Sequence, residues 1–267
     1  MNDPVSIEAD YVKNVKLGYY PDIRNPKSFN EHLLHDKMFN RNPLLITTTD
    51  KVAVNEYVKS KGYEDILIEN YHITSNIQTI PFNELSGTYI VKPNQLSGSL
   101  MVVKNNNIPR TEILDNCKKW LSVTHFGASR FVWYTALIRP KIIFQRYLGD
   151  NIIDYKFHVI KNRVAFISIY TNCPMEFQHR RNINYDTNWK VLPFTIRQPK
   201  GNPIHKPGNL SEMILVAEKL SEPFRYVRVD LYNVNGRIYF GELTHHPNSG
   251  SGRFIPAIYD YYYGKLF

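Results

Sequence analysis

The chain has 267 residues, with 33 Lys and Arg against 24 Asp and Glu, so its formal net charge is +9. Hydrophobic residues make up 43% of the sequence and charged residues 21%, which excludes a disordered chain and supplies ample apolar residues for a core. The positive charge favours an anionic partner: nucleic acid, an anionic membrane, phosphates or an acidic substrate. Composition alone does not choose among them.

The sequence also carries information on the compartment. Cys117 and Cys173 are the two cysteines and stand in no metal or redox spacing, which argues against a disulfide scaffold or a zinc site. The first residues are acidic and show no signal-peptide pattern. The most apolar run, 164–175, is shorter than the roughly 20 residues of a membrane span. We therefore expect a cytoplasmic protein with no membrane span.

Capping residues and apolar spacing predict four helices, over residues 29–39, 50–62, 113–123 and 209–222. The first begins at a capping box, in which Ser28 is followed three residues later by Glu31. Asp50 is the expected cap of the second helix, which would carry Lys51. Asn209 opens the last helix.

Runs of β-branched and aromatic residues predict seven strands, over 88–92, 99–103, 141–145, 154–160, 164–171, 226–234 and 237–244. Strands outnumber helices and several come in consecutive pairs. This favours an α+β fold with antiparallel sheets over a doubly wound parallel sheet. The long polar segment 172–207 is a candidate active-site loop or lid.

The last two predicted strands form a hairpin at Asn235-Gly236, and each carries one acid. A two-residue turn would leave the acids on different faces. A three-residue loop would pair Val234 with Ile238 and set Asp230 directly opposite Glu242. Facing carboxylates repel unless a cation lies between them, and hard oxygen ligands suit Mg²⁺. The alternative is two exposed acids at a sheet edge.

Two further features suggest phosphate binding. Lys92 ends a strand and is followed by the small-residue loop Ser97, Gly98 and Ser99, where backbone N–H groups and a lysine can hold polyphosphate. This is not a Walker loop, because the lysine precedes the glycine and no helix follows. Lys156 adds a cation in a third strand. The alternatives are an ordinary hairpin turn and a surface lysine.

In this order, these features resemble the TupA-like ATP-grasp family, which is linked to bacterial teichuronopeptide and surface-polysaccharide synthesis. The resemblance covers about residues 29–254, and its most specific stretch is 224–250. That stretch contains Val-Arg-Val-Asp-Leu-Tyr-Asn-Val-Asn-Gly and Tyr-Phe-Gly-Glu-Leu-Thr. Shorter matches lie at 28–31, 42–44, 50–51, 56–58, 154–157, 186 and 189.

The resemblance implies an ATP-grasp fold, in which two α+β subdomains with antiparallel sheets grip ATP between them. The implied organisation is an N-terminal helical segment over 1–45, an N-terminal subdomain with the phosphate loop over 46–140, and a C-terminal subdomain with the metal site over 141–267.

The resemblance also implies ATP and Mg²⁺ as cofactors and assigns residues to them. Phosphate contacts are expected from Lys51, Lys92, Lys156 and Arg228, of which the last two act on the transferring phosphoryl group and count as catalytic. Ser97, Gly98 and Ser99 would close over the phosphates. Adenosine contacts are expected from Gln145, Tyr147 and Leu148. The implied metal ligands are Asp230, Glu242 and Thr244. The sequence departs from the family at Gln145-Arg146, where two acids are usual.

The acceptor side is less defined. Basic or hydrogen-bonding residues of the presumed lid and of the segment after Glu242 are expected to bind an acidic substrate: Arg180, Arg181, His245, His246, Asn248 and Arg253. Arginine forks suit carboxylates. For the Arg pair and the His pair, solvated loop residues are the alternative. His32 and His35 have metal-like spacing, but packing or surface roles are favoured for them.

The leading interpretation is a carboxylate–amine ligase that uses ATP and Mg²⁺ to form an amide through an acyl-phosphate. The expected acceptor is a uronic acid of a capsular or cell-surface polysaccharide, and no nucleic acid partner is expected. Two alternatives remain: a sugar or polysaccharide kinase on the same fold, or a non-catalytic basic module that binds nucleic acid or acidic glycan.

Overall fold

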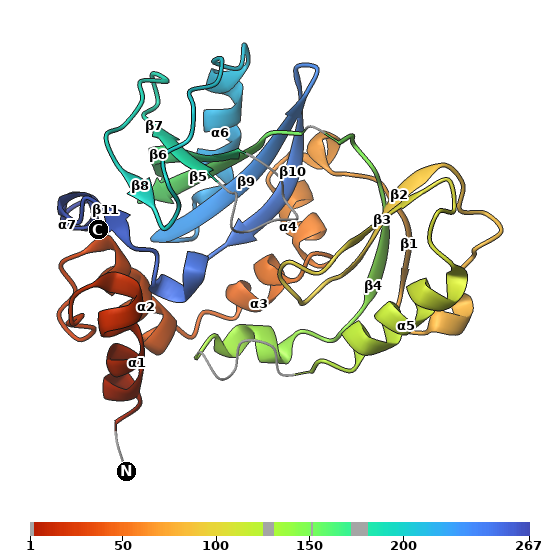
Figure 1. Ribbon diagram of the computed structural model, residues 1–267, viewed down its shortest axis with the longest axis horizontal. Helices are drawn as coiled ribbons and strands as arrows, with labels where there is room; N and C mark the ends of the chain where they lie inside the picture. Colours follow the sequence, from red (N-terminus) through yellow and green to blue (C-terminus); the bar gives the residue numbers. More distant parts are fainter. Residues whose placement is uncertain (1–2, 125–130, 151, 172–180) are drawn as a thin grey trace. The chain divides into compact units, whose positions relative to one another are not determined.

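The computed structural model describes residues 3–124, 131–150, 152–171 and 181–267 (Figure 1). The chain forms two compact units: unit 1 combines Met1–Asn42 with Ile152–Phe267, and unit 2 is Pro43–Asn151. The N-terminal segment is thus part of unit 1. The strand at 142–146, which the sequence analysis assigned to the C-terminal subdomain, lies in unit 2.

Unit 1 is built on a five-stranded antiparallel sheet with the strand order β10-β9-β5-β6-β7. Its strands are β5 (Asp154–Ile160), β6 (Arg163–Thr171), β7 (Arg181–Tyr185), β9 (Tyr226–Val234) and β10 (Arg237–Thr244). The predicted bounds of β5, β9 and β10 are confirmed. Helix α6 (Leu210–Ser221) contacts β5, β6 and β9 and buries Met213, Val216 and Leu220 (Figure 1).

The remaining helices of unit 1 are α1 (Pro4–Val12), a π-helix (Lys13–Leu17), α2 (Phe29–Phe39), α7 (Ile258–Gly264) and a 3₁₀ turn (Pro247–Gly250). The predicted capping box of α2 is confirmed, because Ser28 and Glu31 each accept the other's backbone N–H. An aromatic core joins α2 and α7 to the sheet and to the short pair β8 (Thr195–Ile196) and β11 (Phe254–Ile255). It includes Phe29, Phe166, Phe194, Phe254 and Tyr263.

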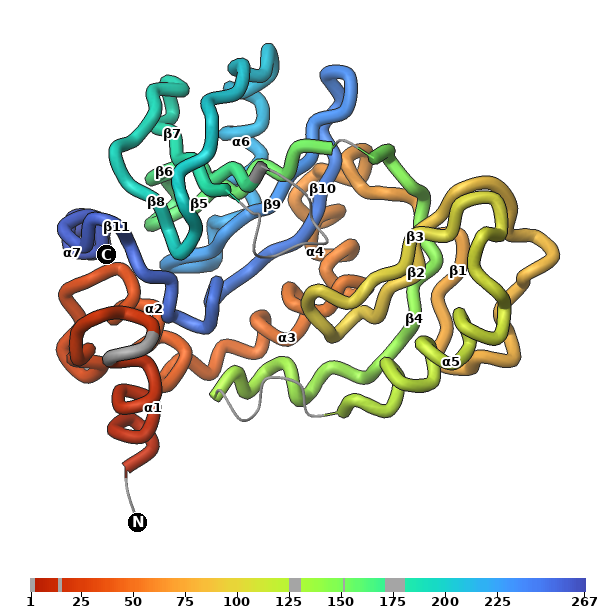
Figure 2. The backbone as a smooth tube through the Cα atoms, in the orientation of Figure 1, coloured from red at the N-terminus to blue at the C-terminus, as the bar shows by residue number. Residues whose placement is uncertain are grey.

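Unit 2 holds a four-stranded antiparallel sheet with the order β1-β4-β2-β3, whose path is visible in Figure 2. Its strands are β1 (Asn70–Thr74), β2 (Thr88–Pro93), β3 (Met101–Lys104) and β4 (Ile142–Arg146). Helix α5 (Arg110–Leu121) packs against this sheet through Ile113, Cys117 and Trp120. The cysteine is buried as a free thiol.

The shorter helices of unit 2 are α3 (Leu44–Thr49), α4 (Val54–Ser60) and 3₁₀ turns at Glu64–Ile66, Ile77–Thr79 and Trp133–Leu137. The second predicted helix begins later than expected. Asp50 caps a turn by accepting the backbone N–H of Val52 at 2.8 Å, so Lys51 precedes α4 instead of lying in it. Within the described ranges, no helix has the length and hydropathy needed to cross a membrane.

Candidate active site

The polar face of the unit 1 sheet gathers the charged residues of three neighbouring strands. In β5 and β9, Lys156 pairs with Asp230 and His158 pairs with Arg228. Alternate residues of a strand point to the same face, so the side chains of each pair stand on one side of the sheet. The strand pairing therefore brings together residues that are 70 and 74 positions apart in the sequence.

The hairpin places Asp230 opposite Glu242, as predicted, but by a different route. Asn235 and Gly236 both have positive φ values, 54° and 83°, which is the two-residue turn of a tight hairpin. Val234 consequently pairs with Arg237, so of the two loops that the sequence allowed the two-residue turn is present, and the pairing of Val234 with Ile238 does not occur. A bulge after Phe240 supplies the extra residue and restores the facing acids.

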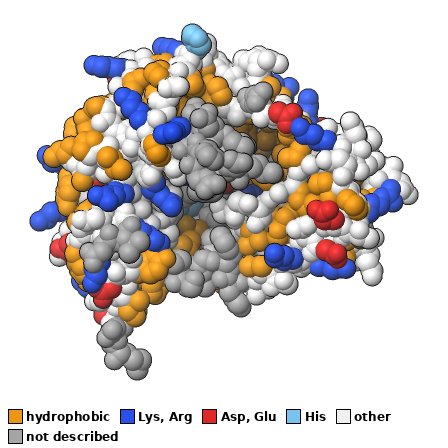
Figure 3. Space-filling view, in the orientation of Figure 1, with side chains coloured by type: hydrophobic (Ala, Val, Ile, Leu, Met, Phe, Trp, Pro, Cys, Tyr) orange, Lys and Arg blue, Asp and Glu red, His pale blue; other side chains and the backbone are white. Residues whose placement is uncertain are grey.

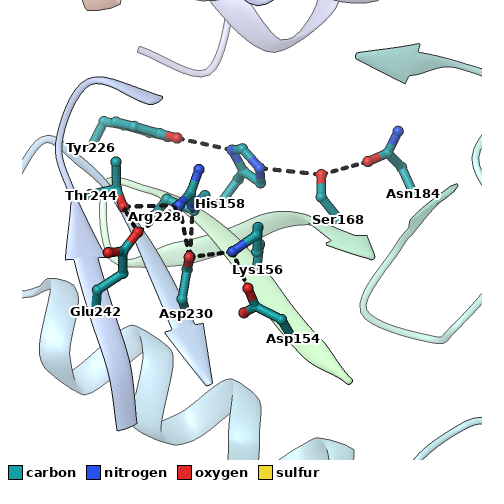
Figure 4. A network of polar contacts seen from close by, with 10 residues as sticks. All are labelled: Asp154, Lys156, His158, Ser168, Asn184, Tyr226, Arg228, Asp230, Glu242 and Thr244. Carbon is teal, nitrogen blue, oxygen red and sulfur yellow. Dashed lines mark hydrogen bonds and ion pairs between the residues drawn. The ribbon is translucent and has the colours of Figure 1, made fainter. Parts of the chain in front are cut away.

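These side chains form a cluster of ion pairs, drawn in Figure 4. The guanidinium of Arg228 donates to both oxygens of Asp230, at 2.6 and 2.7 Å, and to Glu242 Oε1 at 3.1 Å. The Lys156 ammonium donates to Asp230 Oδ2 at 2.5 Å and also to Asp154. Thr244 donates its hydroxyl proton to Glu242 Oε1 at 2.9 Å. Three carboxylates thus share two cations.

The two facing carboxylates differ in exposure. The Asp230 side chain is 2% exposed, whereas that of Glu242 is 39% exposed. Burial raises the pKa of Asp230 to about 6, against the opposing pull of Arg228 and Lys156, so this carboxyl is ionised at neutral pH. Burial alone would lower the pKa of Lys156 and Arg228, but the neighbouring carboxylates outweigh it and raise both.

Two groups of residues in this face were missed by the sequence analysis. Asp154 contacts Lys156, and its Oδ1 atom is buried without a hydrogen-bond partner. Beside the ion pairs runs a neutral hydrogen-bonded chain from Tyr226 through His158 and Ser168 to Asn184 (Figure 4). The available signal was the two-residue spacing of Asp154 and His158 from Lys156, which places all three on one face.

In unit 2, the structure brings two predicted nucleotide-binding residues together. The Lys92 ammonium donates to Gln145 Oε1 at 2.8 Å, from β2 to the neighbouring strand β4. The amide of Gln145 also donates to Asn70 Oδ1 at 2.9 Å, which fixes its orientation. Arg146, which departs from the family pattern, is exposed at the end of β4.

The predicted phosphate loop lies beside a second lysine. Lys51 donates to the carbonyl oxygen of Leu96 at 2.7 Å, directly before the residues Ser97, Gly98 and Ser99. Gly98 has a φ of 71°, a conformation that glycine adopts without strain. Of the remaining predicted contacts, Tyr147 donates to Asp150, and Leu148 lies next to it in the segment after β4.

The predicted acceptor residues are dispersed. His245 and His246 are buried, so the alternative of solvated loop residues is wrong for this pair. His246 Nε2 lies 2.9 Å from Asp36 Oδ2 in α2. Asn248 accepts from Arg197 at 2.9 Å, while Arg181 and Arg253 are exposed. Arg180 lies outside the described residues.

Two other sequence interpretations can be compared with the structure. His32 stacks on Phe267 with ring centroids 4.4 Å apart, and His35 Nδ1 contacts the carbonyl of Ile23, so their packing roles are confirmed. In the space-filling view, the described Lys and Arg side chains are spread over the visible face and form no single continuous stripe there (Figure 3).

The donor set of the cluster fits a magnesium ion. Asp230, Glu242 and Thr244 offer hard oxygen atoms on adjacent strands, and Mg²⁺ typically takes one or two carboxylates together with phosphate oxygens. No group of three or more His, Cys, Asp or Glu side chains suited to a metal occurs in the described part of the chain. An ion here would therefore depend on oxygens of the nucleotide, and it would compete with Arg228 and Lys156 for Asp230.

Comparison with known proteins identifies the family. The TupA-like ATP-grasp family matches residues 31–267, and the chain belongs to it. The two α+β units with antiparallel sheets thus form an ATP-grasp fold. No curated protein matches the sequence.

Among solved structures, the chain is similar to D-alanine–D-alanine ligase from Bacillus anthracis complexed with ATP, with 16% identity and a TM-score of 0.45 over 74% of this chain and 55% of that one. It is also similar to D-alanine–D-alanine ligase from Helicobacter pylori, with 14% identity and a TM-score of 0.47 over 82% and 56%. A third similar structure is L-amino acid ligase from Bacillus licheniformis, with 15% identity and a TM-score of 0.47 over 76% and 44%. The chain spans about half the length of these proteins.

Proposed function

We propose that this member of the TupA-like ATP-grasp family is a carboxylate–amine ligase that uses ATP and Mg²⁺ to form an amide through an acyl-phosphate. The observation that carries the proposal is the cluster on the unit 1 sheet, where Asp230 faces Glu242 and Arg228 contacts both. Facing carboxylates beside two fixed cations are an arrangement suited to phosphoryl transfer.

The strands fix these groups before any substrate binds. Arg228 and Lys156 would bind the oxygens of the transferring phosphoryl group and stabilise the charge that develops there. Asp230 and Glu242, with the Thr244 hydroxyl, would hold Mg²⁺, which neutralises the phosphate charge when bound. The partly exposed Glu242 is the more accessible of the two carboxylates. Asp230 is the buried anchor that orients both cations.

The proposed reaction has two steps. An oxygen of the acceptor carboxylate attacks the γ-phosphorus of ATP, and the bond to the β,γ-bridging oxygen breaks to release ADP. The amine then attacks the carbonyl carbon of the acyl-phosphate, the C–O bond breaks, and inorganic phosphate leaves with one oxygen of the original carboxylate. The amine loses a proton to solvent. Arg228 and Lys156 would contact the phosphoryl oxygens in both steps.

The nucleotide contacts proposed for unit 2 are those that the family resemblance implies: Lys51, Lys92, Ser97, Gly98, Ser99, Gln145, Tyr147 and Leu148. The hydrogen bond between Lys92 and Gln145 supports the assignment, because it holds the ammonium group in one place. Gln145 takes the position of a family acid without its charge. It would therefore orient Lys92 toward a phosphate without adding a negative charge at this position.

The acceptor is proposed to be a uronic acid of a capsular or cell-surface polysaccharide. The net charge of +9 and the exposed arginines Arg181 and Arg253 support an acidic substrate. Because His245 and His246 are buried, the proposed acceptor contacts are Arg180, Arg181, Asn248 and Arg253.

The proposal is tested by measuring ADP release with Mg·ATP, candidate uronic acids and amines, followed by mass spectrometry of the products. Asp230→Asn and Glu242→Gln should each abolish turnover. Two exposed acids provide matched controls, Asp115→Asn and Glu56→Gln, which should leave it unchanged. An amide product is expected; a phosphoester would identify a kinase, and unchanged turnover in both site variants would remove the metal assignment.

A further inference from the structure

In the neutral hydrogen-bonded chain beside the ion cluster, the donor and the acceptor of each hydrogen bond can be assigned. The assignment starts from a backbone N–H group. The N–H of Ile196 donates to Asn182 Oδ1 at 2.9 Å, so this atom is an oxygen. Asn184 Nδ2 donates to the same oxygen at 2.9 Å and to the carbonyl of Phe194 at 3.0 Å. A carbonyl oxygen can only accept, so the amide of Asn184 is also fixed and its Oδ1 is an acceptor.

The direction continues to the histidine. Ser168 must donate its single hydroxyl proton to Asn184 Oδ1, at 2.5 Å. Its oxygen can then only accept from His158 Nε2, at 3.2 Å, so Nε2 carries the ring proton. The other ring nitrogen, Nδ1, is left as an acceptor, and the Tyr226 hydroxyl donates to it at 2.9 Å. Every donor and acceptor on the His158 ring has a partner.

His158 lies next to the ion cluster, opposite Arg228 on the neighbouring strand. The residue pairs with Arg228 across β5 and β9 (Figure 4). Its ring is buried and stacks on Phe166, with the ring centroids 4.1 Å apart. Burial lowers the pKa of His158 well below its ordinary value, and the cations Arg228 and Lys156 lower it further. Arg228 therefore pairs across the strands with a neutral histidine whose accepting lone pair is already occupied, and its guanidinium is hydrogen-bonded to the charged Asp230.

We infer that His158 is a positioning residue for Arg228: held as the neutral Nε2–H tautomer, it offers the guanidinium neither a charge nor a free acceptor. Arg228 then directs its donors to Asp230, Glu242 and Thr244. The expected effect of His158 on turnover rests on the proposed ligase function. Its expected effect on the position of the Arg228 guanidinium does not depend on that function.

The test uses two variants that interrupt the chain on either side of the histidine. Ser168→Ala removes the acceptor of the Nε2 proton, so the tautomer is no longer fixed. Tyr226→Phe removes the donor to Nδ1 but leaves the Nε2 proton in place. Tyr155→Phe is the matched control, because Tyr155 is a buried tyrosine on the opposite face of β5.

Two readouts are independent of activity. In ¹⁵N-histidine spectra at pH 7, with His158 assigned from the spectrum of His158→Gln, the wild type and Tyr226→Phe should show the Nε2–H tautomer. Ser168→Ala should show a mixture. Proton exchange at Arg228 Nε, which donates to Asp230 at 2.6 Å, should be slow in the wild type and in Tyr155→Phe and faster in the other two variants.

The third readout is turnover of Mg·ATP. Both chain variants should lose about tenfold in kcat, with a smaller change in KM, as is typical when a partner behind a site residue is removed. An Nδ1–H or protonated His158 in the wild type would overturn the inference. So would unchanged Arg228 exchange in both variants. If the wild type shows no turnover at all, the ligase proposal fails, and the two spectroscopic readouts still decide the role of His158.

Discussion

Gly241 lies against the backbone of Asp230 so closely that a Cβ atom on the glycine would be 2.9 Å from the Asp230 carbonyl oxygen. The ring of Tyr232 would be 3.2 Å away on the same strand. Gly241 is the extra residue of the bulge that sets Asp230 opposite Glu242. The two carboxylates therefore face each other only because position 241 is a glycine, since a larger residue would come too close to the facing strand.

Alanine substitutions at three glycines should distinguish an effect on the geometry of the site from an effect on the stability of the fold. Gly241→Ala forces the bulge apart, so we expect loss of Mg·ATP turnover with a loss of about 1–3 kcal/mol in the free energy of unfolding. Gly236→Ala strains a turn with a φ of 83° but meets no neighbour, so it should lower stability while turnover persists. Gly208→Ala has open space and an ordinary φ, and should change neither. Equal activity in Gly241→Ala and Gly208→Ala would contradict the account.

The two facing acids should differ in what they contribute to stability. Asp230→Ala leaves the mostly buried cations Arg228 and Lys156 without their shared partner, and should lower the free energy of unfolding by about 3 kcal/mol. Glu242→Gln removes a carboxylate that is 39% exposed, and should change it by less than about 1 kcal/mol. Urea denaturation measures both. Similar losses for the two variants would mean that Asp230 is not the anchor of the cluster.

Gln145 should act through Lys92. In Gln145→Ala the ammonium loses the acceptor that holds it, so we expect KM for ATP to rise several-fold with a smaller change in kcat. Gln145→Glu keeps an acceptor at the same place and serves as the conservative comparison. Steady-state kinetics with varied ATP distinguishes the two. If Gln145→Ala kept the wild-type KM, Lys92 would not need this partner.

One half-buried histidine, His32, and one buried histidine, His245, should make the protein less stable in acid. Burial, mainly, lowers the pKa of His32 to about 4 and that of His245 to about 3, from an ordinary value near 6.5. The unfolded chain therefore binds more protons as the pH falls below 6.5, and the stability that these neutral rings contribute is lost between pH 6.5 and 3. Asp260, whose pKa burial raises to about 6, acts in the opposite sense.

A single variant isolates this effect. His32→Phe keeps a ring on Phe267 and removes one titrating group, so stability should fall less between pH 7 and pH 4 than in the wild type. Denaturation midpoints at several pH values provide the comparison. An unchanged pH slope would show that His32 does not titrate as described.

The predicted bounds of β5, β9 and β10 agree with the structure because a strand pattern is formed by residues that are close together in the sequence. Period-two apolar and aromatic residues bounded by turns define 154–160 and 226–234, and strand bounds follow from that pattern. The bulge at Gly241 was not predicted, since a one-residue insertion is decided by contact with the facing strand. The turn was left open for the same reason, because Asn235-Gly236 fits a two-residue or a longer loop until the pairing is known.

Other differences between the sequence-based predictions and the structure arise from contacts between residues that are distant in the sequence. His246 pairs with Asp36, 210 residues earlier, and no local pattern indicates that a histidine pair after a strand will be buried. The strand at 142–146 joins unit 2 because it pairs with β1 and β2, whose paired residues precede it by 49 to 75 positions. For His158, alternation predicts the face of the sheet but not the hydrogen-bonded partners that define its tautomer.

The fate of an acceptor oxygen tests the central claim most directly. A uronic acid labelled with ¹⁸O in its carboxylate is incubated with the enzyme, Mg·ATP and an amine, and the released inorganic phosphate is analysed by mass spectrometry. An acyl-phosphate route transfers one ¹⁸O atom from each acceptor to the phosphate, and we predict this result for the wild type. Amide formation with unlabelled phosphate, or transfer of the phosphoryl group to a sugar hydroxyl, would contradict the account.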